Sequence, residues 1–318
     1  MNVQPSWLGM VRGDTPLIVS MPHTGTDIPP ELESRFVSSW LARKDADWWV
    51  HLLYDFAPVL GATLIRTSLS RSVIDVNRDP SGRSLYPGQA TTELCPTTSF
   101  DGEPLYRDDD LPDAQEIARR REHYFMPYHA ALEAEIARLR NRHQRVVLFE
   151  AHSIRSRIPR LFEGELPNFN IGTNSGASCA HELTAAIEEV CDAFSLDPPP
   201  PAGEIRPRAG ERGSRAHESV QHSSAPSLRG TSASCGGGKF TRITNGRFKG
   251  GYTTRHYGEP DRGVHAVQLE LAMRGYMDEP DLLSPQNWPP AYDVDRAASM
   301  RAVLQSILET CLSFASRS

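Results

Sequence analysis

One short stretch, residues 146–153, constrains the fold of this chain more than any other. It begins with four apolar residues, two of them β-branched, a pattern typical of a strand buried on both faces within a parallel sheet. Glu150, His152 and Ser153 follow this apolar run. Ligands of open α/β sheets bind beyond the carboxyl ends of the strands, so His152 is well placed to bind a metal or transfer a proton. A capping or turn histidine is the alternative interpretation.

Similar polar residues follow apolar segments in the amino-terminal half of the chain. Residues 16–21 predict a short buried strand, and His23 comes directly after it. A helix is expected over residues 31–40, and Asp45 and Asp47 then precede a second helical segment. Either aspartate could be a helix N-cap instead of a ligand.

A third segment, residues 72–78, combines packing residues with polar ones. Its apolar residues suit a strand, and Asp75, Asn77 and Arg78 crowd polar groups where this strand would end. An Asn-Arg pair at a strand end can hold a carboxylate, because the guanidinium binds it with two hydrogen bonds and the amide adds another. An exposed turn is the alternative, since Asn, Asp and Pro favour turns.

The carboxy-terminal half adds an acidic residue and a basic loop. Residues 264–271 predict the last strand, with Glu270 near its end and Arg274 four residues further on. The glycine-rich stretch 247–258, which contains Arg255 and His256, is expected to cover a substrate.

The alternation of strands and helices predicts the fold class. We expect a single α/β domain over residues 1–318, with a mostly parallel or mixed central sheet and helices on both faces. Residues 113–143 predict the clearest helix, whereas residues 153–174 are expected to form a loop. Residues 198–238 hold a proline run and scattered arginines with almost no apolar periodicity, so we expect a flexible insertion there.

Composition argues against several classes of protein. The net charge of −6 makes general nucleic-acid binding an unsuitable role, and no apolar run approaches the ~20 residues that span a membrane. The amino terminus lacks the pattern of a signal peptide. The five cysteines are scattered, with no Cys-x-x-Cys pair, which argues against a disulfide framework or a structural zinc knuckle. A cytoplasmic protein is expected, and local arginines would have to hold any anionic ligand.

These residue types suit a zinc hydrolase, which needs nitrogen and oxygen ligands, an open position for water and a carboxylate free of the metal. His23, His152 and an acidic residue, for which Asp47 is favoured, would supply the ligands, and Glu270 the free base. The motifs His-Glu-x-x-His, Gly-x-Ser-x-Gly and the phosphate-binding loop are absent. A structural ion pair of Glu270 with Arg274 or another arginine is the alternative for that carboxylate. The candidate anion-binding residues are Arg71, Asn77, Arg78 and Arg255.

A series of motifs runs in order along nearly the whole chain outside residues 198–238. They are Ser20–Gly25, Asp45–Trp48, Asp75–Arg78, Tyr86–Thr92, Glu103–Tyr106, Glu150–Pro159, Asn245–Gly251, Thr254–Gly258 and Val267–Leu271. In these motifs the chain resembles the N-formylglutamate amidohydrolases of histidine degradation. The resemblance implies a distant branch of the zinc carboxypeptidase and aspartoacylase fold, with one divalent ion, most suitably Zn²⁺.

In that wider fold a His-Ser pair ends one strand, an Asn-Arg pair holds the substrate carboxylate, and a strand-end glutamate drives the attack of water. His152, Asn77-Arg78 and Glu270 occupy matching places. The chain departs at the first ligand motif, because Thr26 stands where the wider fold has a glutamate three residues after the histidine. The acidic ligand is therefore expected to be Asp47 rather than Asp27 or Glu150.

The activity that the resemblance implies is metal-dependent hydrolysis of N-formyl-L-glutamate to formate and L-glutamate. The implied partner is this small anionic substrate, with neither nucleic acid nor membrane. A related zinc deacylase or carboxypeptidase acting on another N-acyl amino acid, and a non-catalytic small-anion binding protein, are the alternatives. The residues expected to bind the substrate are Arg71, Asn77, Arg78, Arg255, His256 and Arg274.

Overall fold

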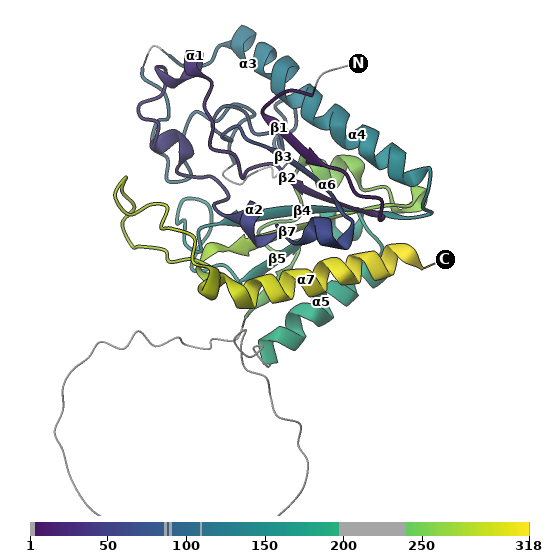
Figure 1. Cartoon of the computed structure of the whole chain (residues 1–318). Coiled ribbons are helices and arrows are strands. Elements are labelled where there is room, and N and C mark those ends of the chain that lie inside the picture. Colours follow the sequence, from purple (N-terminus) through teal and green to yellow (C-terminus); the bar gives the residue numbers. More distant parts are fainter. Residues whose placement is uncertain (1–3, 86–87, 89–90, 109, 197–239, 318) are drawn as a thin grey trace, which may run out of the picture.

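A mixed β-sheet forms the centre of the computed structural model, which describes residues 4–85, 88, 91–108, 110–196 and 240–317. Its seven strands lie in the order β1-β3-β2-β4-β7-β5-β6 (Figure 1). β3, β2, β4 and β7 run parallel to one another, whereas β1 is antiparallel to β3 and β5 is antiparallel to β7. The strands are β1 (Leu8–Val11), β2 (Leu17–Met21), β3 (Thr63–Thr67), β4 (Val146–Ile154), β5 (Phe169–Gly172), β6 (Arg242–Thr244) and β7 (Val264–Ala272).

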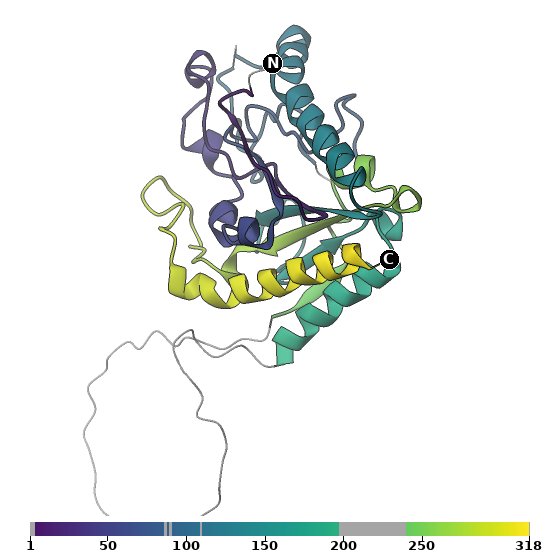
Figure 2. The same ribbon diagram turned by 45° about the vertical axis from the view of Figure 1, so that its right-hand side comes forward.

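Helices cover both faces of this sheet, as Figures 1 and 2 show from two directions. The α-helices are α1 (Pro30–Glu33), α2 (Val50–Leu53), α3 (Ala114–Arg120), α4 (Met126–Arg140), α5 (His181–Leu196), α6 (Tyr252–Tyr257) and α7 (Val294–Ser316). A π-helical segment (Arg121–Phe125) joins α3 to α4, and short 3₁₀ turns cover Leu41–Arg43, Ala57–Leu60, Asn174–Gly176, Pro260–Arg262 and Met273–Gly275.

The side chains of the central strands point alternately to the two faces of the sheet, so the hydrophobic core forms a layer on each face. Val147 and Phe149 of β4 pack into the cluster that α5 and α7 complete, whereas Val146 and Leu148 pack with α4 on the other face. Successive side chains of a strand point to opposite faces, so one apolar run serves both layers. The predicted α/β fold with helices on both faces is confirmed. No helix in the described part of the chain is long and apolar enough to span a membrane.

The register of the two central strands gathers polar side chains on one face. β4 and β7 pair in parallel, with His152 beside Glu270 and Glu150 beside Gln268. These four side chains therefore point to the same face, the one on which α4 packs. α6 lies against β4 and β7 at this place. All nine residues of each strand are buried, including the polar ones.

Three expectations about local structure are wrong. Residues 31–40 are helical only to Glu33, because the chain then bonds to a distant segment through the bridge between Phe36 and Tyr106. Residues 72–78 form turns, and the Asp75 carboxylate accepts from the amide of Asn77. The expected loop 153–174 contains β5. The insertion expected at 198–238 lies outside the described residues.

Candidate active site

Two histidines and an aspartate come together at the carboxyl ends of the central strands. His23, Asp47 and His152 each offer a ligand atom, and these atoms all lie within 4.8 Å of one another. The Asp47 carboxylate oxygen Oδ2 lies 2.9 Å from Nδ1 of His152 and 3.8 Å from Nδ1 of His23. All three residues are buried. The structure thus brings together the three residues that the sequence analysis named as metal ligands.

A fourth buried residue, Asp75, orients this cluster. Its Oδ1 lies 2.7 Å from Nε2 of His23, and its Oδ2 accepts a hydrogen bond of 2.6 Å from Nη2 of Arg71. Because an ionised carboxylate only accepts hydrogen bonds, it keeps the proton of His23 on Nε2. The lone pair of Nδ1 is thereby left on the side of Asp47, and that nitrogen is buried with no hydrogen-bond partner among the described residues.

Burial and neighbouring charges set the protonation of these groups. Burial opposes ionisation of Asp75, but the positive charges of His23, Arg78 and Arg71 hold its pKa well below the usual value. Burial, together with the charge of Arg71, lowers the pKa of His23, which favours the neutral ligand form. Burial disfavours the charged forms of Asp47 and His152, but the hydrogen bond between the two side chains outweighs this effect. It lowers the pKa of Asp47 and raises the pKa of His152.

These features fit a divalent metal ion. Buried nitrogen and carboxylate oxygen atoms are the donors that zinc takes in hydrolases. Nδ1 of His23 and Oδ1 of Asp47 are buried without a hydrogen-bond partner among the described residues, a costly state that a bound cation would relieve. The Asp75–His23 pair matches the carboxylate–histidine arrangement that orients metal ligands in proteins. Binding would also require His152 to release the proton that Asp47 stabilises.

Glu270 lies next to this cluster, on the same face of the sheet as His152. Burial raises the pKa of Glu270 to about 7, and the opposing charge of His152 is offset by that of Asp47. Nε2 of Gln268 donates a hydrogen bond of 3.2 Å to its Oε2. A carboxylate with such a pKa can both accept and donate a proton near neutral pH. Among the described residues no arginine forms an ion pair with Glu270, and Arg274 pairs with Glu165 at 3.0 Å instead.

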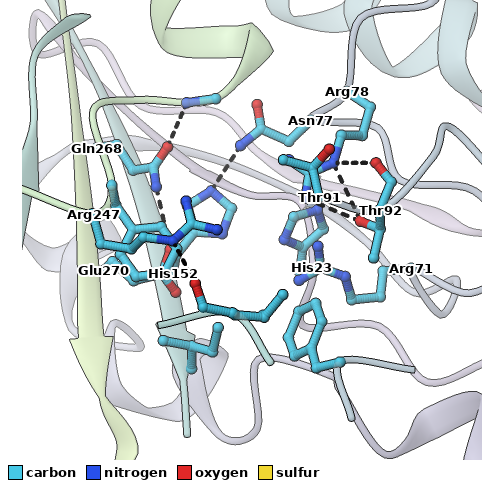
Figure 3. Close-up of a pocket in the computed structure, with 15 residues that line it drawn as sticks. His23, Arg71, Asn77, Arg78, Thr91, Thr92, His152, Arg247, Gln268 and Glu270 are labelled. Atoms are coloured by element: carbon cyan, nitrogen blue, oxygen red, sulfur yellow. Dashed lines mark hydrogen bonds between the residues drawn. The ribbon is translucent and has the colours of Figure 1, made fainter. Parts of the chain in front are cut away.

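Arginines and threonines complete a cavity around the cluster (Figure 3). Arg78 lies on one side, where its Nη2 donates to the Thr92 hydroxyl at 3.0 Å. Arg247 lies on the other side, near Gln268. The lining residues are His23, Arg71, Asn77, Arg78, Thr91, Thr92, Phe100, His152, Ile154, Leu161, Arg247, Phe248, Gly251, Gln268 and Glu270. The cavity therefore combines a proton-transfer group, a candidate metal centre and positive charge.

Three of the predicted substrate-binding residues lie apart from this lining. Nε of Arg255 donates to the carbonyl of Gly250 at 2.9 Å, and the His256 ring stacks on Tyr252 with 4.8 Å between centroids. Both residues belong to α6, which the sequence analysis expected as a loop. Arg274 is held by Glu165, as described above. Of the two alternative acidic ligands, Asp27 is exposed, and Glu150 accepts from the Thr254 hydroxyl instead.

Sequence reasoning missed Arg247 and Gln268 as cavity residues and gave Asp75 no role of its own. Gln268 had a usable signal, because it stands two positions before Glu270 and therefore points to the same face of the strand. Arg247 lies within the Asn245–Gly251 motif, but nothing in its local pattern separates it from Arg255. Only the path of the chain after β6 distinguishes them.

The fold and this cavity define a class, an α/β protein with a candidate metal centre of the hydrolase type. A family model described as N-formylglutamate amidohydrolase matches residues 15–277. The N-formylglutamate deformylase of Pseudomonas aeruginosa is 40% identical over 307 residues, which cover 96% of both chains. That of Pseudomonas putida is 37% identical, with the same coverage. The chain therefore belongs to the N-formylglutamate amidohydrolase family.

Solved structures share the fold at lower sequence identity. The crystal structure of N-formylglutamate amidohydrolase from Ralstonia eutropha superposes with a TM-score of 0.68, at 21% identity, over 98% of both chains. A gene product of Agrobacterium tumefaciens gives a TM-score of 0.60 at 17% identity, over 98% of this chain and 95% of that one. In each comparison the shared fold therefore covers nearly the whole length of both proteins.

Proposed function

We propose that the protein hydrolyses N-formyl-L-glutamate to formate and L-glutamate, a reaction of histidine degradation. One observation carries the proposal. Glu270, whose pKa is raised to about 7, lines one cavity together with arginines and with His23 and His152, the two histidines of the cluster that Asp47 completes. The relatives named N-formylglutamate deformylase support the choice of substrate.

We further propose that His23, Asp47 and His152 hold one divalent ion, with Zn²⁺ as the ion that suits these donors. Such an ion supplies a Lewis acid, which polarises a carbonyl and lowers the pKa of water. Asp75 would keep His23 in the tautomer that binds through Nδ1.

Glu270 would perform the proton transfers. Its ionised carboxylate would accept a proton from water as the water oxygen forms a bond to the formyl carbon. The same carboxyl group would then donate this proton to the amine nitrogen as the C–N bond breaks. One water is consumed, and formate and the free amino acid leave. Gln268 would hold the carboxylate in position through its hydrogen bond to Oε2.

Positive charge would bind the dianionic substrate. Arg78 donates a hydrogen bond to Thr92, and its Nε lies 3.6 Å from Oδ2 of Asp75. This places it beside the residues that support the candidate metal centre, where it would bind a substrate carboxylate with two hydrogen bonds.

The test is formate release from N-formyl-L-glutamate by the zinc-loaded protein, before and after treatment with a chelator. We expect activity that disappears with the metal and returns when zinc is restored. N-acetyl-L-glutamate and N-formyl-L-methionine serve as comparison substrates, assayed by release of the free amino acid, which every substrate yields. Preference for the acetyl compound would indicate a related deacylase, and no product from any substrate would indicate an anion-binding protein. Zinc-loaded Glu270→Gln protein controls for contaminating enzymes, because it should retain metal but lose turnover.

A further inference from the structure

The loop that carries Arg247 is anchored at both ends over the cavity. At the start of residues 245–251, Oδ1 of Asn245 accepts hydrogen bonds from the amides of Thr173 and Ser175, at 2.9 and 3.2 Å. At the end of the loop, the amide of Gly251 donates to Oε1 of Gln268 at 2.7 Å. A Cβ at Gly251 would lie 2.3 Å from the side-chain nitrogen Nδ2 of Asn77. Because Oδ1 of this side chain accepts from the amide of Thr253 at 2.9 Å and so holds it in place, only glycine allows this approach.

Arg247 points from this anchored loop into the cavity. Its Nε donates to the carbonyl of Leu161 at 3.0 Å, and its guanidinium carbon lies 5.5 Å from the centre of the Phe248 ring. Figure 3 shows Arg247 across the cavity from Arg78. The two guanidinium groups are therefore presented to the cavity from opposite sides, on separate segments of the chain.

The third arginine of the cavity, Arg71, already serves the protein itself. It is buried, bonds to Asp75 at 2.6 Å and lies 3.7 Å from Asp47. Its charge therefore balances two carboxylates of the candidate metal centre. The two carboxylates of the proposed substrate are left to the arginines on the cavity walls, Arg78 and Arg247.

The surroundings of these two arginines differ. Arg78 follows Asn77, whose side-chain nitrogen lies 3.0 Å from Nε2 of the candidate ligand His152. Arg247 instead contacts two apolar lining residues, since its Nε donates to the carbonyl of Leu161 and its guanidinium lies over the ring of Phe248. A glutamate side chain consists of two methylene groups that end in a carboxylate, and an apolar wall with an arginine suits such an arm. The α-carboxylate is attached to the carbon that bears the reacting nitrogen, so it belongs nearer the metal centre.

We propose that Arg247 binds the side-chain carboxylate of the substrate and sets the selectivity for glutamate, while Arg78 binds the α-carboxylate. This assignment rests on the proposed function and divides the substrate between two subsites. If the assignment is correct, replacing each arginine should reduce kcat/KM only for substrates that carry the carboxylate which that arginine binds.

The experiment removes one charge at a time from the protein and from the substrate. Zinc-loaded wild type, Arg247→Gln and Arg78→Gln are assayed with N-formyl-L-glutamate, with its γ-amide N-formyl-L-glutamine, and with its α-amide N-formyl-L-isoglutamine. For Arg247→Gln we expect a loss in kcat/KM of roughly 10- to 100-fold with N-formyl-L-glutamate and little change with the γ-amide. Its preference for an α-carboxylate over an α-amide should remain. Arg78→Gln should show the converse pattern.

Arg242→Gln is the matched control. Arg242 precedes the anchored loop by three residues and pairs with Asp192 outside the cavity, so this variant should keep the wild-type selectivity. Arg247→Lys restores a positive charge without the planar fork and should recover part of the preference for glutamate over glutamine. Recovery would separate loss of charge from loss of the contact with Leu161.

Two results would overturn the assignment. If folded Arg247→Gln protein still prefers N-formyl-L-glutamate over the γ-amide as strongly as wild type does, Arg247 does not bind that carboxylate. If wild-type protein with zinc releases no formate from N-formyl-L-glutamate, the proposed function fails first, and the assignment fails with it. The wild-type assay alone distinguishes these two failures.

Discussion

Replacing Asp75 by Asn tests whether one buried carboxylate supports the candidate metal centre. Asp75 accepts from His23, from Arg71 and from the amide of Asn77. Asn has the same size but carries no charge, and its NH₂ group would face one of these donors. The variant therefore leaves the Arg71 guanidinium buried without its closest counter-charge, and the acceptor that orients His23 changes from a charged carboxylate to at most a neutral amide oxygen.

The magnitude follows from burial. Removing one partner of a buried ion pair typically costs ~3–5 kcal/mol. For a chain of this length, that corresponds to a fall of roughly 4–8 °C in melting temperature. Loss of an outer partner of a ligating histidine weakens metal binding by roughly 10- to 100-fold. We therefore expect Asp75→Asn to lower both the melting temperature of the metal-free protein and its affinity for zinc.

Asp192→Asn provides a control with the same contact in a different environment. Asp192 lies 2.6 Å from Nη2 of Arg242, the distance that separates Asp75 from Arg71, but its side chain is 53% exposed. Exposed pairs contribute about 0–1 kcal/mol, so this variant should melt close to wild type. The assays are thermal unfolding in chelator and competitive zinc titration. Equal melting shifts in the two variants, or unchanged zinc affinity in Asp75→Asn, would refute the reasoning.

Three further predictions concern the ligands and the proposed base. Wild-type protein should carry approximately one zinc ion per chain by elemental analysis, whereas His152→Ala should purify folded, without zinc and inactive. Full activity of this variant without metal would contradict the mechanism. Glu270→Gln should lower kcat by about 10²- to 10⁴-fold in steady-state assays while bound zinc stays unchanged; near-normal kcat would remove Glu270 from the mechanism. Burial raises the pKa of Glu270 from 4.5 to about 7, so folding favours its protonated form in metal-free protein. This contribution to stability is present below pH ~4.5 and is lost as the pH rises to ~7. In urea titrations, the stability of Glu270→Gln relative to wild type should therefore increase from pH 5 to pH 8. A difference in stability that does not change with pH would contradict this prediction.

The sequence by itself determined the fold class and the candidate ligands of the site. Buried parallel strands favour apolar runs, so residues 16–21 and 146–149 could be recognised locally, and residues 264–271 could be recognised by their alternation of apolar and polar residues. His23 and His152 follow the first two of these runs, and parallel strands bring their carboxyl ends to one edge of the sheet. The placement of both histidines at one edge of the sheet was therefore expected from strand direction, whereas the pairing of β2 with β4 is a finding of the structure.

Only the tertiary structure decided which polar residues share the cavity. Arg247 and Arg255 stand in similar glycine-rich surroundings, but hydrogen bonds of Asn245 to residues 173 and 175 direct the first into the cavity. Asp75 obtains its partners from segments far apart in the sequence, such as His23. Strand register and loop path are set by long-range pairing and packing, which leave no local periodic signal, so the choice among chemically similar side chains required the folded chain.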